Sequence, residues 1–311
     1  MSKLGLIPLR SRVQEATARY ARAGAEIRDV LKGLTVETYT PARAGSTLSK
    51  VESVVRELDA FGRRWAKKSL PAAYKEGRRV AEATLQMIGA RRNPRFKQSR
   101  HDRAARRYAE ATFKDLTHAN RTIRGEAGKY IAAVALGRQA ADRAREREIS
   151  EAQAFDMGVI NKIIKKARTL DPKYGKHRAE GWVVRAIDGY LQKFAEAGKF
   201  IKIIGRDGKA RLYNLRDYAE TVARTKMREA QTRALEESCK EWENDLVQFS
   251  KHADPCPICS PLEGKIFSIS GKHPTYPKLT DAERPPIHCR CEHSLNATSE
   301  IALRAREKYA G

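Results

Sequence analysis

Residues 46–69 read STLSKVESVVRELDAFGRRWAKKS and carry apolar side chains three or four positions apart. The apolar positions are Leu48, Val51, Val54, Val55, Leu58, Phe61 and Trp65. An α-helix has about 3.6 residues per turn, so this spacing places the side chains on one face of a helix. The pattern predicts an amphipathic helix and favours a mainly helical fold.

The same periodicity occurs on both sides of this segment. Residues 9–33 predict a helix that Gly33 ends, and residues 35–45 predict a loop. Pro71 is expected to open another helix through residue 90, because a proline in the first turn gives up no hydrogen bond that it needed. Further helical patterns cover 101–149, 154–170 and 179–197.

A β-hairpin is predicted after these helices. Residues 200–204 and 209–213 are rich in strand-forming side chains, and the turn signal Asp207-Gly208 lies between them. Asn214 is expected to cap a helix that runs to about Trp242. The predicted fold is therefore mainly α, with a small β-hairpin and a C-terminal α+β module built on a zinc knuckle.

The charge indicates a polyanionic partner. The 311 residues include 62 Lys and Arg against 38 Asp and Glu, a net charge of +24, which suits nucleic acid or an acidic protein surface. The longest apolar run, 131–136, is far shorter than the roughly 20 residues of a membrane span. Since the N-terminus also lacks the apolar core of a secretory signal, we expect a soluble protein made in the cytoplasm, with no membrane partner.

The positive charge is concentrated in the first half of the chain, where residues 1–150 carry a net +17. Its densest block, 91–107, sets eight cations against Asp102 alone and begins in a loop broken by Asn93-Pro94. The cations are Arg91, Arg92, Arg95, Lys97, Arg100, Arg103, Arg106 and Arg107. Like charges this close repel, so we expect an anion to neutralise them. Double-stranded DNA bound without sequence preference is one such anion, and acidic residues of a protein partner are the other.

Four of the five cysteines lie in two short motifs near the C-terminus. The first reads Asp-Pro-Cys-Pro-Ile-Cys over 254–259, and the second reads His-Cys-Arg-Cys-Glu-His over 288–293. Cys-x-x-Cys can place two thiolates around one tetrahedral zinc ion, and His288 and Cys291 repeat that spacing. The predicted ligands are Cys256, Cys259, His288 and Cys291, with Cys289 and His293 in reserve. Four protein ligands leave no open position for water, which predicts a structural zinc rather than a catalytic one.

Disulfides and free thiols are the alternatives to a metal. Disulfides seldom persist in the cytoplasm, and a redox role for Cys-x-x-Cys requires a βαβ context that the sequence lacks.

Further residues around these motifs form a recognisable pattern. They are Ala223-Arg224-Thr225, Arg228-Glu229-Ala230, Asp254, Cys256, Cys259, Leu262, Gly264, Lys265, Phe267, Pro285-Pro286-Ile287-His288 and Cys291. The stretch 218–295, about a quarter of the chain, resembles the Mu F-like minor head proteins of tailed bacteriophages, also called head morphogenesis or minor capsid proteins. The closing motif of that family falls on His288, Cys291 and His293, and Cys289 departs from it.

The resemblance implies a protein packaged in few copies inside the capsid. Such a protein binds the portal, contacts the genome near the exit channel, and serves head assembly and DNA packaging or ejection. Capsid and scaffold proteins are further implied partners. The implied location is the virion interior near the portal, after assembly in the bacterial cytoplasm, and no catalytic activity is implied.

Two other classes of protein stay open. A zinc-braced nuclease or another capsid-associated enzyme would need a histidine base and a Mg²⁺ ligand, for which His252, His273 and Asp254 are present without a recognisable spacing. A zinc-ribbon DNA-binding regulator would usually carry a recognition helix, and none is evident.

The expected organisation has five consecutive parts. They are a portal-docking helical region over 1–90, a basic linker over 91–107, a helical region over 108–199, a hairpin, long helix and zinc-knuckle module over 200–296, and a tail over 297–311. Leu58, Phe61 and Trp65 are the predicted docking anchors, because large apolar side chains dominate protein interfaces. The alternative is that their stripe packs inside the chain.

Overall fold

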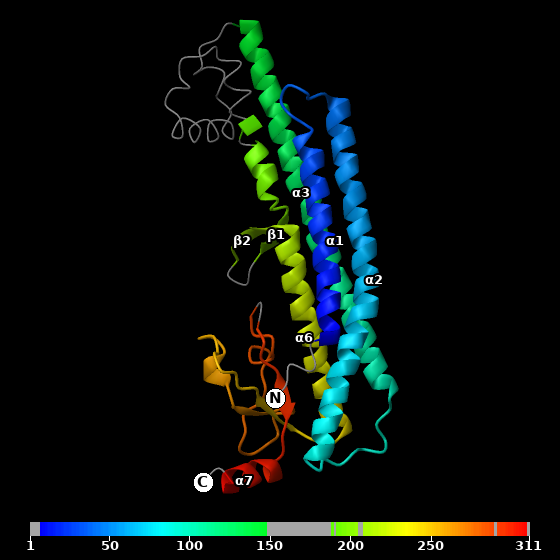
Figure 1. Ribbon diagram of the computed structural model, residues 1–311, viewed down its shortest axis with the longest axis vertical. Coiled ribbons are helices and arrows are strands. Elements are labelled where there is room, and N and C mark those ends of the chain that lie inside the picture. Colours follow the sequence, from blue (N-terminus) through cyan, green and yellow to red (C-terminus); the bar gives the residue numbers. More distant parts are fainter. Residues whose placement is uncertain (1–6, 148–187, 190, 205–207, 289–290, 310–311) are drawn as a thin grey trace. The chain divides into compact units, whose positions relative to one another are not determined.

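The computed structural model describes residues 7–147, 188–189, 191–204, 208–288 and 291–309 (Figure 1). It is mainly helical with small antiparallel sheets, which confirms the predicted fold class. The helices are α1 (Ile7–Lys32), α2 (Pro41–Met87), α3 (Ser99–Arg147), α6 (Leu215–Glu241) and α7 (Glu300–Tyr309), with a 3₁₀ turn η3 (Ser260–Leu262). The strands are β1 (Ile201–Ile204), β2 (Ala210–Tyr213), β3 (Leu246–Phe249), β4 (Ile266–Ser268) and β5 (Leu295–Ala297). No helix in the described ranges has the length and apolarity to span a bilayer.

Helix α2 differs from the prediction because it is continuous from Pro41 to Met87 and holds Pro71 in its interior. Pro71 cannot donate to the carbonyl of Lys67, so one backbone hydrogen bond is missing there. Arg12 contacts the helix next to this point, where its guanidinium donates to the carbonyl of Lys68 at 3.3 Å. The predicted helix start at Pro71 is therefore wrong. Pro41 opens the helix instead, and a proline in the first turn gives up no backbone hydrogen bond.

Helices α1 and α3 and the hairpin follow the prediction. Strand β1 pairs antiparallel with β2, and Asn214 caps α6 by accepting the backbone N–H of Asp217 at 2.8 Å. The predicted helix over 154–170, and most of that over 179–197, lie outside the described residues.

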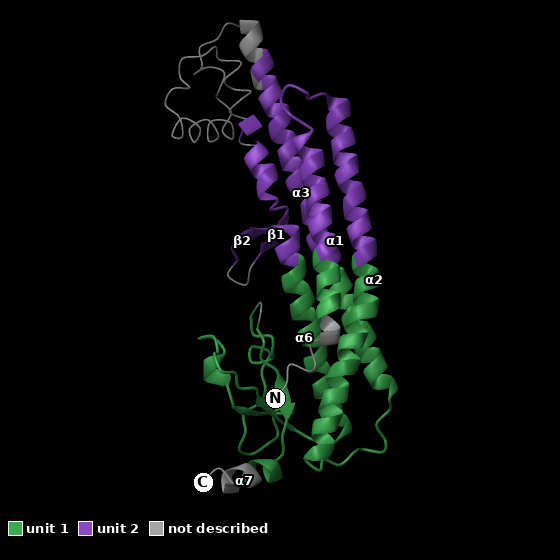
Figure 2. Cartoon of the chain, in the orientation of Figure 1, with its two compact units in different colours: residues 1–17, 62–115, 219–311 green, residues 18–61, 116–218 purple. Residues whose placement is uncertain are grey.

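The chain forms two compact units, coloured in Figure 2. One comprises residues 1–17, 62–115 and 219–311, and the other comprises 18–61 and 116–218. Each unit joins segments that are far apart in the sequence, whereas the predicted parts are consecutive ranges. The assignment of separate functions to those ranges remains a prediction.

The unit of residues 18–61 and 116–218 has a buried polar link in its core. The Tyr20 hydroxyl bonds Asn120 at 3.2 Å, and the amide of Asn120 donates to Asp59 at 2.8 Å. Because Tyr20 lies on α1, Asp59 on α2 and Asn120 on α3, the link fixes the register of three helices. Burial raises the pKa of Tyr20 well above its usual range, so its hydroxyl remains a proton donor.

Two of the predicted docking anchors belong to the core. Leu58 is fully buried, and Trp65 is 4 % exposed with its indole N–H donating to the carbonyl of Arg12 at 2.9 Å. Phe61 is half-buried and its ring meets Tyr20 edge to face at 6.4 Å between centroids. Leu58 and Trp65 therefore pack inside the chain, as the alternative interpretation of their stripe expected. Docking on a portal is a separate matter and remains a prediction.

The other unit brings α6 close to α2 and α3. A Cβ atom at Gly77 would lie only 2.6 Å from the Cα of Gln231, so α2 and α6 approach backbone to backbone at that position. The Tyr108 hydroxyl donates to the carbonyl of Lys226 at 3.0 Å and to Glu229 at 2.5 Å, which fixes α3 against the same helix. These contacts hold the helix that leads into the C-terminal module.

A buried carboxylate joins four segments of this unit. Glu241, 1 % exposed at the end of α6, accepts from Arg92 at 2.7 Å and from Arg78 at 3.4 Å, and bonds His101 at 2.9 Å. The backbone N–H of Asn93 also donates to the carbonyl of Glu241 at 2.8 Å. Burial pushes the pKa of Glu241 up, but the bonds from His101 and Arg92 and the charge of Arg78 outweigh burial, so the pKa is lowered. The network anchors the basic loop between α2 and α3.

We expect Glu241→Gln to lower the unfolding free energy by about 2 kcal/mol near pH 7, because it weakens the hydrogen bonds that a buried carboxylate makes with Arg78, Arg92 and His101. A lowered pKa means that the carboxylate stabilises the fold above about pH 4.3, its unfolded value, and loses that effect as the pH falls further. Denaturant unfolding at pH 7 and pH 3.5 should show the gap between wild type and variant closing in acid. Glu57→Gln, which removes a surface pair with Arg19, is the control and should change stability by about 1 kcal/mol or less. An equal effect of both variants at pH 7 would contradict the anchoring role.

The C-terminal module is built on a three-stranded antiparallel sheet in the order β4-β3-β5. Its core includes Val247, Phe249, Phe267 and Leu295 from the sheet, together with Leu85 of α2, Leu235 and Cys239 of α6, and Trp242 directly after α6. Two cysteines of the predicted zinc site, Cys259 and Cys291, are members of the same core. The module therefore presents these thiols from within a hydrophobic cluster.

Candidate metal centre

The first motif forms a tight turn directly after β3. The backbone N–H groups of Cys259 and Ser260 both donate to the carbonyl of Cys256, at 3.0 and 2.9 Å. Gly264, with φ +74°, then donates to the carbonyl of Phe249 at 3.0 Å and returns the chain to the sheet. Only a residue without Cβ adopts this φ readily, so Gly264 closes the loop that carries Cys256 and Cys259.

The second motif forms a matching turn that leads into β5. The N–H of Cys291 donates to the carbonyl of His288 at 3.2 Å, the same bond that joins the ends of the first motif. Ser250 donates its N–H to the carbonyl of Ser294 at 2.9 Å, which ties the end of β3 to the start of β5. The central strand thereby brings two turns together that are about 30 residues apart in the sequence.

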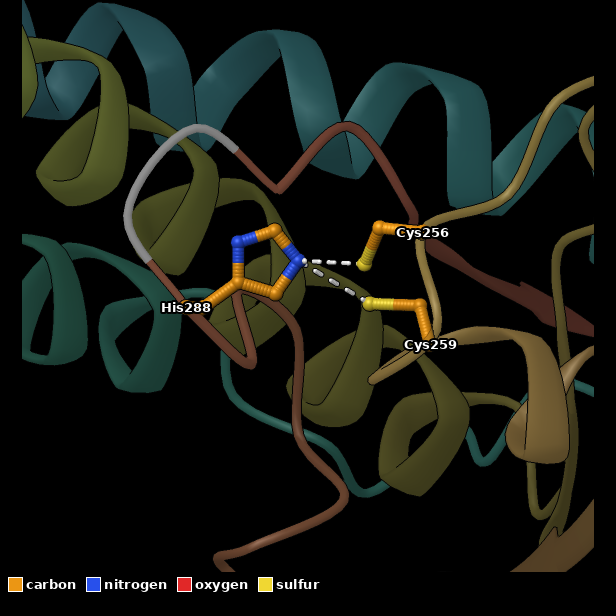
Figure 3. Close-up of side chains that lie close together, drawn as sticks. All are labelled: Cys256, Cys259 and His288. Carbon is orange, nitrogen blue, oxygen red and sulfur yellow. Dashed lines mark hydrogen bonds between the residues drawn. The ribbon is translucent and has the colours of Figure 1, made fainter.

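The predicted ligand atoms converge as Figure 3 shows for three of them. Nε2 of His288 lies 3.0 Å from Sγ of Cys256 and 3.2 Å from Sγ of Cys259. The Sγ atoms of Cys259 and Cys291 are 3.8 Å apart. In tetrahedral zinc with Zn–S near 2.3 Å, two sulfurs lie about 3.8 Å apart and a sulfur and a nitrogen about 3.6 Å apart. The spacing between Cys259 and Cys291 agrees with that value, and His288 would move outward by about half an ångström to admit the ion.

The ligand atoms form two overlapping groups. Within each group the atoms lie within 4.8 Å of one another: Cys256, Cys259 and His288 form one, and Cys259, Cys291 and His293 form the other. Among the described residues, the four predicted ligands do not all meet that limit together. Cys259 is the shared member, and Cys289 lies outside the described residues.

The two thiols of the first turn differ in acidity. The backbone N–H of Cys259 stabilises the thiolate of Cys256 and lowers its pKa, whereas burial raises the pKa of Cys259 to about 12. A buried thiol of this kind becomes a thiolate when a cation is bound beside it. The residues therefore fit a divalent, thiophilic metal ion such as zinc: three thiols and two imidazoles lie in two overlapping groups that share Cys259. The described cysteines are free, so the disulfide alternative does not apply to them.

The remaining candidates from the nuclease hypothesis are not gathered into a site. His273 bonds Glu300 at 3.0 Å, His252 bonds Ser250 at 3.2 Å, and Asp254 is exposed. Within the described ranges, none of the three belongs to a Cys/His/carboxylate group that could hold a metal.

The predicted DNA-binding residues lie on the loop after α2 and on the first turns of α3. All eight side chains are exposed. Arg92 also pairs with Glu241, and the guanidinium of Arg100 lies over the ring of Phe96 at 5.0 Å. The structure thus gathers the cations on one loop and one helix end, while DNA contact itself remains a prediction.

Comparison with known proteins was informative for the C-terminal part. Residues 183–297 match the family model of phage minor capsid protein 2. The match supports a phage minor capsid family for this chain and a role associated with the phage head. No curated protein and no solved structure matches the chain. The phage minor capsid protein 2 match spans the hairpin, α6 and the Cys/His module, and it includes the stretch 218–295 that carries the resemblance.

Glu263 and Arg228 contribute to the site without having been assigned a role from the sequence. Glu263 accepts from Nε2 of His293 at 2.8 Å, and that bond lowers the pKa of Glu263. Burial lowers the pKa of Arg228 on α6, opposed by the charges of Cys291 and Glu292. No short-range pattern points to Glu263, because His293 lies 30 positions away in the sequence.

Proposed function

We propose that this chain is a Mu F-like minor capsid and head morphogenesis protein of a tailed bacteriophage. It binds the portal inside the head, contacts the genome, and acts in head assembly and DNA packaging or ejection. The observation that carries the proposal is the match of residues 183–297 to phage minor capsid protein 2, together with the resemblance over 218–295. Both coincide with the folded Cys/His module.

The module acts as a structural part of this protein. Zinc held by Cys256, Cys259, His288 and Cys291 would cross-link the two turns on either side of β3, and it would supply folding energy to a segment with few large apolar side chains. Minor capsid proteins are structural, which fits a protein without enzyme activity. Purified protein is expected to carry about one zinc per chain, as a closed four-ligand site does.

The basic loop supplies the contact with nucleic acid. Lys and Arg bound to phosphates release counterions and need no particular base sequence, which suits a protein beside tightly packed DNA. Anchoring by Glu241 keeps the loop in place while its other cations stay exposed.

The assignment is tested in infected cells with the full-length protein. Mass spectrometry of purified proheads and virions should find the chain in both, and chemical cross-linking should join it to the portal protein. Deletion of its gene should give heads that are defective in assembly or in DNA content. Its absence from proheads, or cross-links to host proteins alone, would overturn the proposal.

A further inference from the structure

His293 occupies an unusual position beside the thiols. Its ring is 5 % exposed and packs near the rings of Phe249, at 5.1 Å, and His252, at 4.2 Å between centroids. The two ring nitrogens lie on the edge of the imidazole, where it can form hydrogen bonds or bind a metal.

The two nitrogens on that edge have different neighbours. Nε2 bonds the Glu263 carboxylate at 2.8 Å, and Nδ1 faces Sγ of Cys291 at 3.9 Å. A carboxylate at Nε2 keeps the proton on that nitrogen, so the lone pair of the neutral ring is at Nδ1 and points toward the thiols. The Nδ1 to Sγ distance is close to the roughly 3.6 Å expected for two ligands of one tetrahedral zinc ion.

Glu263 is itself held in place by the first turn. The same Oε1 atom accepts the backbone N–H of His252 at 2.7 Å, and Glu263 follows η3 directly after the loop that carries Cys259. The Glu263 carboxylate therefore links the segment before the first Cys/His motif, at His252, to the end of the second motif, at His293. Metal-binding histidines in proteins typically donate their other N–H to such a carboxylate.

We propose that His293 is a ligand of the metal centre through Nδ1, with Cys259 and Cys291 beside it, and that Glu263 is its positioning residue. The inference rests on the proposed metal centre and revises its set of four ligands: Cys259, Cys291 and His293 are three of them, and the side that holds Cys256 and His288 supplies the fourth. His288 lies on the more exposed side, next to Cys256. Each of the two Cys/His groups thus contains one imidazole, His288 in the first and His293 in the second, and both groups contain Cys259.

The first test observes the ligand nitrogen directly. Full-length protein labelled with ¹⁵N in histidine and loaded with zinc is examined by long-range proton–nitrogen correlation, and His293 is assigned from its loss in His293→Gln. The proposal expects a proton on Nε2 and the chemical shift of a metal-bound nitrogen at Nδ1. An unbound or protonated Nδ1 in protein that carries one zinc would overturn it. Wild-type protein that binds no zinc would instead overturn the metal centre itself.

The second test concerns Glu263. Glu263→Ala should weaken zinc binding by about 10- to 100-fold, the usual effect of losing a carboxylate behind a metal-bound histidine. Glu263→Gln keeps a carbonyl acceptor for His293 and should restore part of the affinity. The matched control is Glu300→Ala, which removes the same type of pair from His273 in the same module, away from the thiols. Equal zinc affinity in Glu263→Ala and wild type, measured by chelator competition, would overturn the positioning role.

Discussion

Cys259→Ser is expected to abolish zinc binding and to loosen the C-terminal module together. Cys259 belongs to both Cys/His groups, is fully buried, and packs in the hydrophobic core of the module. Structural zinc binds with an apparent free energy of about 10–16 kcal/mol at neutral pH, and that energy is available only to the folded site. Elemental analysis should show loss of the metal, and limited proteolysis should cut residues 254–297 first, while α1 and α3 resist.

Cys239 provides the matched control because it is also fully buried in the same core. It belongs to neither Cys/His group found in the described part of the chain, and its sulfur accepts only a weak bond from Asn244 at 3.8 Å. Cys239→Ser should lower stability by burying a hydroxyl and yet retain one zinc per chain. If Cys259→Ser keeps its zinc and the protease resistance of wild type, the metal centre is wrong.

Removing exposed cations from the basic loop is expected to have the second largest effect. Replacing Arg91, Arg95, Lys97 and Arg103 by alanine removes four charges but leaves the pair between Arg92 and Glu241 intact. Each lost phosphate contact should reduce the slope of log affinity against log salt by about one, so the slope should fall by up to about four. Between 50 and 200 mM salt, four such contacts correspond to a change in affinity of about 10². Fluorescence anisotropy with a mixed-sequence DNA duplex measures both quantities.

The control removes the same charge from another exposed surface, with alanine at Lys50, Arg56, Arg64 and Lys67 of α2. It should keep most of the salt dependence. Equal effects of the two fourfold variants would mean that total charge rather than the loop determines binding. No DNA binding by wild-type protein would favour the other reading of the block, an acidic protein partner.

The features predicted from the sequence are those set by local pattern. The hairpin, the Asn214 cap and the end of α1 before Gly33 depend on residues within a few positions of one another, and all three were predicted correctly. The Cys/His spacing predicted that the two turns come together, because both repeat one hydrogen bond between their ends, while the set of four ligands remains a prediction. Short-range geometry was sufficient in each case.

The features that the sequence did not predict depend on distant partners. Glu241 meets Arg92 across 149 positions, and Glu263 meets His293 across 30, so no local pattern reveals either pair. Leu58 and Trp65 belong to an apolar stripe whose sequence fits either a protein interface or an internal core. Only the packing of the rest of the chain shows that these two side chains are buried. Pro71 was read from local rules alone, although the continuous α2 helix tolerates it.

The close approach of Gly77 to Gln231 also bears on how such a gene can change by recombination. Residues 62–115 and 219–311 form one compact unit, so a crossover anywhere between them brings together α2 and α6 from different parents. The hybrid folds only if position 77 stays free of a side chain and the incoming helix ends in an acid that accepts Arg78 and His101. We therefore expect residues 62–115 and 219–311 to be exchanged together between related genes rather than separately.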